Sequence, residues 1–152
     1  MRNVIAISVV FCALLISCGN QMPKTEQSIV KEKWHWDSPS KQNENAGYAQ
    51  VVKIGNTLYI SGIPSNEIST KGITQLYETL SRCLSAYGAT FEDVVKETLY
   101  TTDIEAMKEN NEVRKKFYGG DYPAATWVQI DRLYEPTAQV EVDLIAEISK
   151  KK

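Results

Sequence analysis

Hydrophobic and polar positions follow the periods of strands and helices along most of the chain. Two β-rich runs, Tyr48–Ile54 and Thr57–Ser61, flank Gly55-Asn56, a dipeptide that tolerates positive φ and favours a tight hairpin. From residue 73 to residue 87, apolar side chains recur three and four positions apart, which is typical of a helix with one buried face. Cys83 falls on that face, where we expect a small and inert hydrophobic residue.

The second half of the chain predicts a strand, a helix and two further strands. Val94–Thr101 alternates as a strand, and Asp103 suits the N-cap of a helix that runs to about Tyr118. A short strand follows at Ala125–Ile130, and Val140–Ile148 alternates with apolar residues on one side and mostly acidic ones on the other. One sheet with two helices packed on one face buries these patterns, so we expect one α/β (α+β) domain of order β-β-α-β-α-β-β.

The first residues of the chain resemble a bacterial lipoprotein signal. An apolar run over residues 4–16 is shorter than the roughly 20 residues that span a bilayer as a helix. Its end, Leu15-Ile16-Ser17-Cys18, resembles the lipobox, in which the cysteine thiol accepts a diacylglyceryl group. We predict a signal peptide over residues 1–17, a lipid on Cys18 and a bacterial cell-envelope location, as a membrane-anchored lipoprotein on the periplasmic or outer surface. An ordinary cleaved signal is the alternative.

A polar stretch connects this signal to the folded part. Residues 18–33 are rich in Gln, Lys, Glu, Ser and Thr, which predicts a lipidated N-terminus and flexible tether before a domain over residues 34–152. Trp34-His35-Trp36 interrupts that composition, and in an extended chain its two indoles point to the same side. We expect them to pin the start of the domain onto its surface, with His35 facing solvent. An aromatic platform for a ligand is the alternative.

Scarce residues and net charge exclude several classes of protein. The chain has one histidine and three cysteines, so a single subunit cannot assemble a zinc site with several clustered Cys and His ligands. The net charge is −2, whereas nucleic-acid-binding proteins usually carry an excess of basic residues. The sequence patterns of the common phosphate-binding loops, GxxxxGK[ST] and GxGxxG, do not occur. We expect no metal, no cofactor and no nucleic-acid partner. The basic run Arg114-Lys115-Lys116 is interpreted as a solvated helix face.

Several short strings stand in a fixed order along the chain: Gly47-Tyr48-Ala49-Gln50, Gly55-Asn56-Thr57-Leu58-Tyr59-Ile60-Ser61-Gly62, Asp93-Val94-Val95-Lys96, Asn111-Glu112-Val113, Pro123-Ala124 and Val140-Glu141-Val142. Together they resemble the RidA/YjgF family, also called the liver perchloric-acid-soluble protein or endoribonuclease L-PSP family. The resemblance implies a chorismate-mutase-like fold. It also implies a homotrimer whose sheets form a central barrel, with a small-molecule cleft at each subunit interface.

Enzymes of this family hydrolyse enamines and imines derived from amino acids, and the resemblance implies where such a site would lie. In them a glutamate on the last strand positions water, and Glu141 matches it. An arginine directly after Pro-Ala holds the substrate carboxylate, but here Ala125 stands at that position. The glutamine that usually follows Ser-Gly is also missing. The other implied substrate-binding positions are Tyr48, Ser61, Gly62, Asn111, Thr126 and Trp127.

The missing arginine changes the expected function. A hydrogen bond to a charged group contributes about 1.5–3 kcal/mol, so an anionic substrate should bind on the order of 10- to 100-fold more weakly. Arg114 and Arg132 are alternative cations for that role. Trp127 either fills the cleft, stacks on an aromatic or hydrophobic ligand, or packs into the trimer interface. Glu141 is either a site residue or one of the polar residues on an amphipathic strand.

We therefore expect a trimer of this family that binds a small metabolite in its clefts, with standard imino-acid deamination impaired by Ala125. The alternative is an enamine or imine deaminase-type hydrolase that acts on an atypical substrate, with Glu141 positioning water. A purely structural trimeric lipoprotein is a third hypothesis. An endoribonuclease is opposed by the net negative charge and the predicted envelope location.

Overall fold

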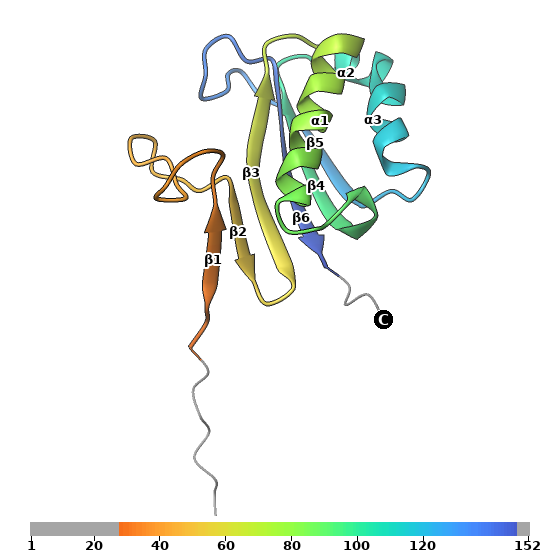
Figure 1. Ribbon diagram of the computed structural model, residues 1–152. Coiled ribbons are helices and arrows are strands. Elements are labelled where there is room, and N and C mark those ends of the chain that lie inside the picture. Colours follow the sequence, from red (N-terminus) through yellow and green to blue (C-terminus); the bar gives the residue numbers. More distant parts are fainter. Residues whose placement is uncertain (1–27, 149–152) are drawn as a thin grey trace, which may run out of the picture.

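The computed structural model describes residues 28–148, which form a mixed six-stranded sheet with helices on one face (Figure 1). The strand order is β1-β2-β3-β6-β4-β5, and all neighbours are antiparallel except β4 and β5. The strands are β1 (Lys31–Trp34), β2 (Val51–Ile54), β3 (Thr57–Ser65), β4 (Val94–Thr101), β5 (Ala124–Gln129) and β6 (Val140–Glu147). The helices are α1 (Thr70–Ser85), the 3-10 turn η1 (Phe91–Asp93), α2 (Ile104–Glu109) and α3 (Asn111–Tyr118).

The predicted α+β class and the predicted order of elements are confirmed, with one helix divided and one strand, β1, added before them. The helix expected after Asp103 is two helices, α2 and α3, that meet at Asn110. Asn110 has a ψ of 7°, and its side-chain amide donates to the Ala106 carbonyl at 3.0 Å, which ends α2. A side chain that bonds the nearby backbone competes with helix continuation, so three helices cover the sheet instead of the predicted two.

The strand β1 was not predicted, because Lys31–Trp34 falls largely in the segment interpreted as a tether. Its sequence lacks apolar alternation, and the strand forms through backbone pairing with β2 and through the ion pair between Glu32 and Lys53. The predicted signal peptide, Cys18 and most of the predicted tether lie outside the described residues. None of the helices in residues 28–148 has the length and hydrophobicity of a membrane-spanning segment.

The core lies between the helices and one face of the sheet. Ser69 caps α1 by accepting from the Gly72 backbone N–H at 3.1 Å, and the apolar face of α1 packs on β3. Cys83 is completely buried there, and burial raises its pKa to about 12, as expected for an inert thiol. β6 contributes every second residue to this core, as the alternation predicts; these are Val140, Val142, Leu144 and Ala146.

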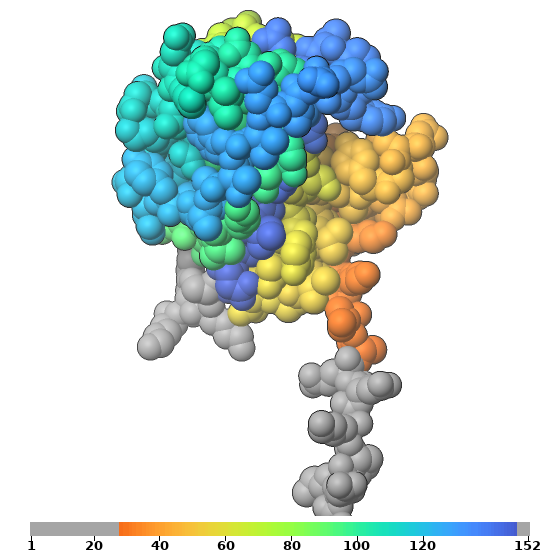
Figure 2. All heavy atoms as spheres, turned by 180° about the vertical axis from the view of Figure 1, so that it is seen from behind, coloured from red at the N-terminus to blue at the C-terminus, as the bar shows by residue number. Residues whose placement is uncertain are grey.

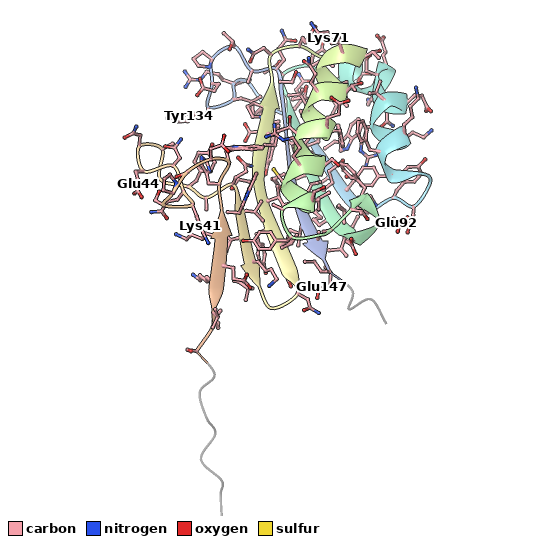
Figure 3. The ribbon with its side chains drawn as sticks, viewed as in Figure 1. Lys41, Glu44, Lys71, Glu92, Tyr134 and Glu147 are labelled. Carbon is pink, nitrogen blue, oxygen red and sulfur yellow. The ribbon has the colours of Figure 1, made fainter. Side chains whose placement is uncertain are left out.

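The opposite side of the sheet carries no helix, and we call it the open face. It consists of residues that alternate with the core positions, including Tyr59, Tyr100, Thr126, Val128, Glu141 and Asp143. Seen from behind, atoms of β3 and β6 lie at the surface (Figure 2). Thr57 donates to Glu147 at 2.7 Å and ties β3 to the end of β6. Figure 3 labels Glu147 at this end of the sheet. The open face therefore presents both polar side chains, such as Glu141, and apolar ones, such as Val128.

Candidate functional site

Glu141 lies directly against the backbone of Gly62 on the open face. The pairing of β3 with β6 shifts register between Ile60 and Ile63, so Gly62 sits in a bulge beside Glu141. A Cβ atom on residue 62 would overlap the Glu141 carboxyl group, and only glycine leaves space for that group here. The structure thus brings together two of the predicted site residues, one from each strand.

Ser61 fixes the neighbouring segment beside this bulge. Its hydroxyl donates to the Ala49 carbonyl at 2.8 Å, and its backbone N–H donates to the Gln50 carbonyl at 2.9 Å. The buried Gln50 side chain returns a hydrogen bond to the Ser61 carbonyl at 2.7 Å. Tyr48, which is 40% exposed, directly precedes this segment. Ser61 therefore connects the bulge at Gly62 to the segment Ala49-Gln50, which directly follows the predicted ligand residue Tyr48.

The Glu141 carboxyl group has no cationic partner among the described residues. Partial burial raises its pKa, and the charge of Asp143, two residues along β6, raises it further. Burial also raises the pKa of Asp143, although its hydrogen bond with Thr98 acts in the opposite direction. A carboxyl group whose pKa is raised exchanges its proton closer to neutral pH, as a general acid or base requires. We call Ser61, Gly62, Glu141 and Asp143 the Glu141 cluster.

The three predicted site residues on β5 do not share one face. Thr126 lies on the open face, where its hydroxyl accepts from the Lys96 ammonium group at 2.5 Å. Ala125 and Trp127 lie on the helix side, opposite Glu97 and Leu99 of β4. β4 separates all three from Glu141 on β6, so one chain does not bring them together with the Glu141 cluster.

Trp127 packs on a buried polar network that the sequence analysis missed. Glu97 is fully buried, and its carboxylate accepts from the hydroxyls of Tyr77 at 2.9 Å and Tyr118 at 2.6 Å. It also accepts from Arg114 Nε at 2.7 Å and from Trp127 Nε1 at 3.3 Å. Burial and then the Glu97 charge raise the pKa of Tyr118, which keeps its hydroxyl a donor. We call these five residues the Glu97 network.

Arg114 corrects the interpretation of Arg114-Lys115-Lys116 as a solvated face. Arg114 is 6% exposed and pairs with Glu97, whereas the Lys115 side chain is 36% exposed and pairs with Glu112 at the surface. The sequence did contain a signal for this burial: Glu97 stands two and four residues before Leu99 and Thr101, so all three side chains point to the buried side of β4. A carboxylate at such a position is rarely buried without a partner, which points to a cation on the covering helix.

His35 is buried, so the prediction that it faces solvent is wrong. It is 8% exposed, its ring meets that of Tyr48 edge-on with centroids 5.2 Å apart, and Nδ1 has no hydrogen-bond partner among the described residues. The pairing of Trp34 with Val51 sends the next residue to the opposite side, where the returning chain at Tyr48 covers it. The loop between His35 and Tyr48 carries Lys41 and Glu44 and projects beyond β1 and β2 (Figure 3).

The two tryptophans beside His35 pack on the protein, as the packing interpretation predicts. The rings of Trp34 and Trp36 meet edge-on at 4.9 Å, and the Arg82 guanidinium lies 4.9 Å from the Trp36 ring centre. Both side chains contact the core. They hold the start of the domain against α1.

Two other predicted groups have contrasting surroundings. Asn111 begins α3, and its Oδ1 atom is buried without a hydrogen-bond partner in the described part of the chain. Arg132 is exposed and donates through Nε to the adjacent Leu133 carbonyl at 3.2 Å. Among residues 28–148, no three His, Cys, Asp or Glu side chains group as metal ligands would.

The fold and the Glu141 cluster define a class of protein: a sheet covered by helices on one side, with a bulged glycine and a glutamate on the other. Residues 40–148 match the family model described as Endoribonuclease L-PSP, and the chain belongs to this family, which is the RidA/YjgF family.

Curated relatives agree with this assignment. A RutC family protein of Saccharolobus solfataricus is 34% identical over 111 residues, covering 67% of this chain and 87% of that protein. A 2-iminobutanoate/2-iminopropanoate deaminase of Dermatophagoides farinae is 31% identical over 110 residues, covering 66% of this chain and 85% of that protein. The shared region therefore includes most of each relative.

Solved structures show the same fold. A YjgF-family protein of Mycobacterium tuberculosis superposes with a TM-score of 0.69 at 24% identity, covering 78% of this chain and all of that chain. RidA of an Antarctic Psychrobacter superposes with a TM-score of 0.64 at 28% identity, covering 80% of this chain and 99% of that chain. The chorismate-mutase-like arrangement implied by the resemblance is thus the fold of this chain.

Proposed function

We propose that the protein is a homotrimer that binds a small metabolite in clefts between subunits. In each cleft, the Glu141 cluster and Tyr48 of one subunit face β5 of the next. The placement of the site residues supports this proposal. Within one chain, strand β4 lies between β5 and Glu141 on β6, so the two halves of the site are apart. A second copy supplies the missing half without any rearrangement of the sheet.

The open face and the edge of the sheet support self-association. β5 is an edge strand, and edges of this kind are paired or covered in stable proteins. Tyr59 is 46% exposed and Val128 is 38% exposed on the open face. Such apolar groups are typical of a surface that another copy covers.

Deamination of ordinary imino acids should be weak in this protein. Relatives named 2-iminobutanoate/2-iminopropanoate deaminase suggest this chemistry, but the resemblance assigns the carboxylate to an arginine where this chain has Ala125. A guanidinium grips a carboxylate with two parallel hydrogen bonds, and a methyl group offers none. Metabolite binding is therefore the function that this site supports best.

The raised pKa of Glu141 favours one alternative function. A carboxyl group that is half-buried and next to Asp143 is suited to activate water. A hydrolase of the deaminase type, acting on an atypical imine or enamine, would use Glu141 in this way and would not require an arginine at position 125.

The site of action that we propose is the bacterial cell envelope, through a lipid on Cys18. The twelve residues between Cys18 and β1 would reach at most about 43 Å if fully extended. The domain would then stay close to the membrane, on its periplasmic or outer surface, where metabolites of the envelope are its ligands. Small-molecule binding also fits the net charge of −2 better than binding of nucleic acid does.

Mass measurement and an imine-hydrolysis assay together test the proposal. We expect a trimer by light scattering, little turnover of amino-acid-derived imines by the natural protein, and a gain of at least about tenfold in Ala125→Arg. Glu141→Gln in the Ala125→Arg background should remove that gain. A monomer in solution, or natural turnover equal to that of Ala125→Arg, would contradict the proposal.

A further inference from the structure

Tyr48 comes at the end of a loop, and its backbone and its ring are held by different groups. The Asn43 backbone N–H donates to the Tyr48 carbonyl at 2.7 Å, and the two residues form an isolated bridge. The Gly47 backbone N–H donates to the Asn43 carbonyl at 2.8 Å and tightens the same turn. Among the described residues, the half-exposed Tyr48 ring meets one other aromatic ring, that of His35. The loop therefore fixes the Tyr48 backbone, whereas His35 fixes the direction of its ring.

His35 is anchored more firmly than Tyr48. It is buried between Trp34 and Trp36 in the sequence, and both tryptophan rings pack against the core. The His35 carbonyl accepts from the Ser38 backbone N–H at 2.9 Å, which closes a turn directly after it. Trp36 has a φ of 27°, a left-handed conformation that a bulky residue adopts only where the surrounding contacts enforce it. His35 is thus a fixed support for the Tyr48 ring.

The buried Nδ1 atom of His35 has no hydrogen-bond partner among residues 28–148. A neutral imidazole has one N–H group and one acceptor nitrogen, so Nδ1 can be the nitrogen without a proton. Protonation makes both ring nitrogens donors, and it would place an N–H group at Nδ1 where the described chain offers no acceptor. A buried donor without an acceptor on a charged ring costs more free energy than one aromatic contact contributes. The neutral ring therefore fits against Tyr48, and the charged ring does not.

No carboxylate compensates for a proton on His35 in the part of the chain that the structure describes. The charged side chains on the elements around it are Lys33, Asp37, Lys41, Glu44, Lys53 and Arg82. None of them forms an ion pair with His35. The Glu32 carboxylate pairs with Lys53, and the Glu44 carboxylate accepts from the Gln42 amide at 2.9 Å. The surroundings of His35 thus favour its neutral form.

We propose that His35 is a positioning residue of the cleft: its neutral ring holds Tyr48 in place for the ligand, and its protonation releases Tyr48. The inference rests on the proposed function and adds a regulation of that same site. Histidine is the side chain whose ordinary protonation falls between about pH 5 and 8. The ligand should bind more weakly on the acid side of this range, because a released Tyr48 must be ordered again on binding.

An NMR titration of the natural protein tests the contact itself. His35 is the only histidine in the chain, so its ring resonances are assigned directly. We expect nuclear Overhauser contacts between the His35 and Tyr48 rings at about pH 8 and their loss at about pH 5, with the midpoint at which His35 titrates. Tyr59 on the open face is the control, and its ring should not follow that midpoint. Contacts between His35 and Tyr48 that persist across the range would overturn the proposal.

His35→Phe is the matched variant, because it keeps an aromatic ring and removes the titratable nitrogens. Tyr48 should then stay in place at both pH values, whereas in His35→Ala it should be released at both. A Tyr48 transition that persists in His35→Phe would show that another group, such as Glu141, controls it, and would overturn the proposal. The titration of the natural protein keeps the test valid if a variant does not fold.

Imine turnover in the Ala125→Arg background reports on the cleft. As the pH falls from about 8 to about 5.5, KM should rise about fivefold more in Ala125→Arg than in Ala125→Arg, His35→Phe. Protonation of the substrate is the same for both chains, so it cancels in the ratio. Equal KM profiles would overturn the role of His35 in the cleft. No turnover by Ala125→Arg would count against the proposed function, and the NMR titration would still decide whether His35 positions Tyr48.

Discussion

The two sides of the sheet hold two glutamates, Glu97 and Glu141, that differ in burial and in hydrogen-bond donors. Glu97, on the helix side, is fully buried and has four hydrogen-bond donors, one of them a cation. Glu141, on the open face, is half-buried, has an acidic neighbour and no cation among the described residues, and has a raised pKa. Burial alone therefore does not define the chemistry of a carboxyl group. The donors around it decide whether it stabilises the fold or remains available to act on a ligand.

The largest effect should come from breaking the pair on the helix side. Arg114→Ala leaves Glu97 charged and buried, which should lower the free energy of unfolding by about 3–5 kcal/mol in urea denaturation. Glu97→Gln, Arg114→Met is the matched control, and it should lose far less. A loss below about 1 kcal/mol in Arg114→Ala would show that the pair does not stabilise the helix side.

On the open face, the glycine beside Glu141 should matter next. Gly62→Ala places a methyl group in the space that the Glu141 carboxyl group occupies, so we expect a loss of about 1–3 kcal/mol. Glu141→Ala in the same chain removes the overlap and should restore most of that stability. Additive losses in the double variant would contradict the close approach of these two residues.

Partial burial of two carboxyl groups on the open face, together with the charge of Asp143 next to Glu141, should give a measurable pH effect. The pKa values of Glu141 and Asp143 are raised in the folded chain, so the folded state binds protons more tightly than the unfolded one. Their contribution to stability is present at low pH and is lost as the pH rises from about 4 through the raised values.

Asp143→Asn should lower the pKa of Glu141 toward its ordinary value, because one cause of the shift is removed. It should also flatten the fall of stability with pH. Carboxyl resonances followed by NMR titration measure the first effect, and denaturation at several pH values measures the second. An unchanged Glu141 pKa would mean that the two carboxyl groups do not interact.

The smallest effect should come from the lysine next to Arg114. Lys115 pairs with Glu112 at the helix surface, and exposed pairs of this kind contribute only a few tenths of a kcal/mol. Lys115→Ala should therefore change the free energy of unfolding by less than about 0.5 kcal/mol in urea. A larger loss would remove the contrast between a buried and a surface cation one residue apart.

Much of the fold could be predicted because alternation and helical spacing report directly on burial. The strand β6, the buried face of α1 and the position of Cys83 follow from such patterns. β1 could not be predicted, since its sequence Lys31–Trp34 has no apolar period and its strand depends on pairing with β2. Local patterns do not show which backbone a polar segment will pair with.

The candidate site was predictable in part for the same reason. The resemblance pointed to Gly62 and Glu141, and their contact gives the glycine a physical purpose. Arg114 and His35 were misplaced because a charged or polar residue is exposed by default, and only tertiary contacts with Glu97 and Tyr48 reveal its burial. Partners that are distant in sequence decide such cases.

Subunit complementation tests the central claim, a cleft shared between copies, most directly. Chains carrying both Ala125→Arg and Glu141→Gln lack the glutamate, and natural chains lack an arginine at position 125. In mixed trimers of the two, some clefts combine the introduced arginine of one copy with Glu141 of another. We predict imine-hydrolysis activity in the mixture above that of either parent. Activity equal to the average of the two parents would contradict a shared cleft.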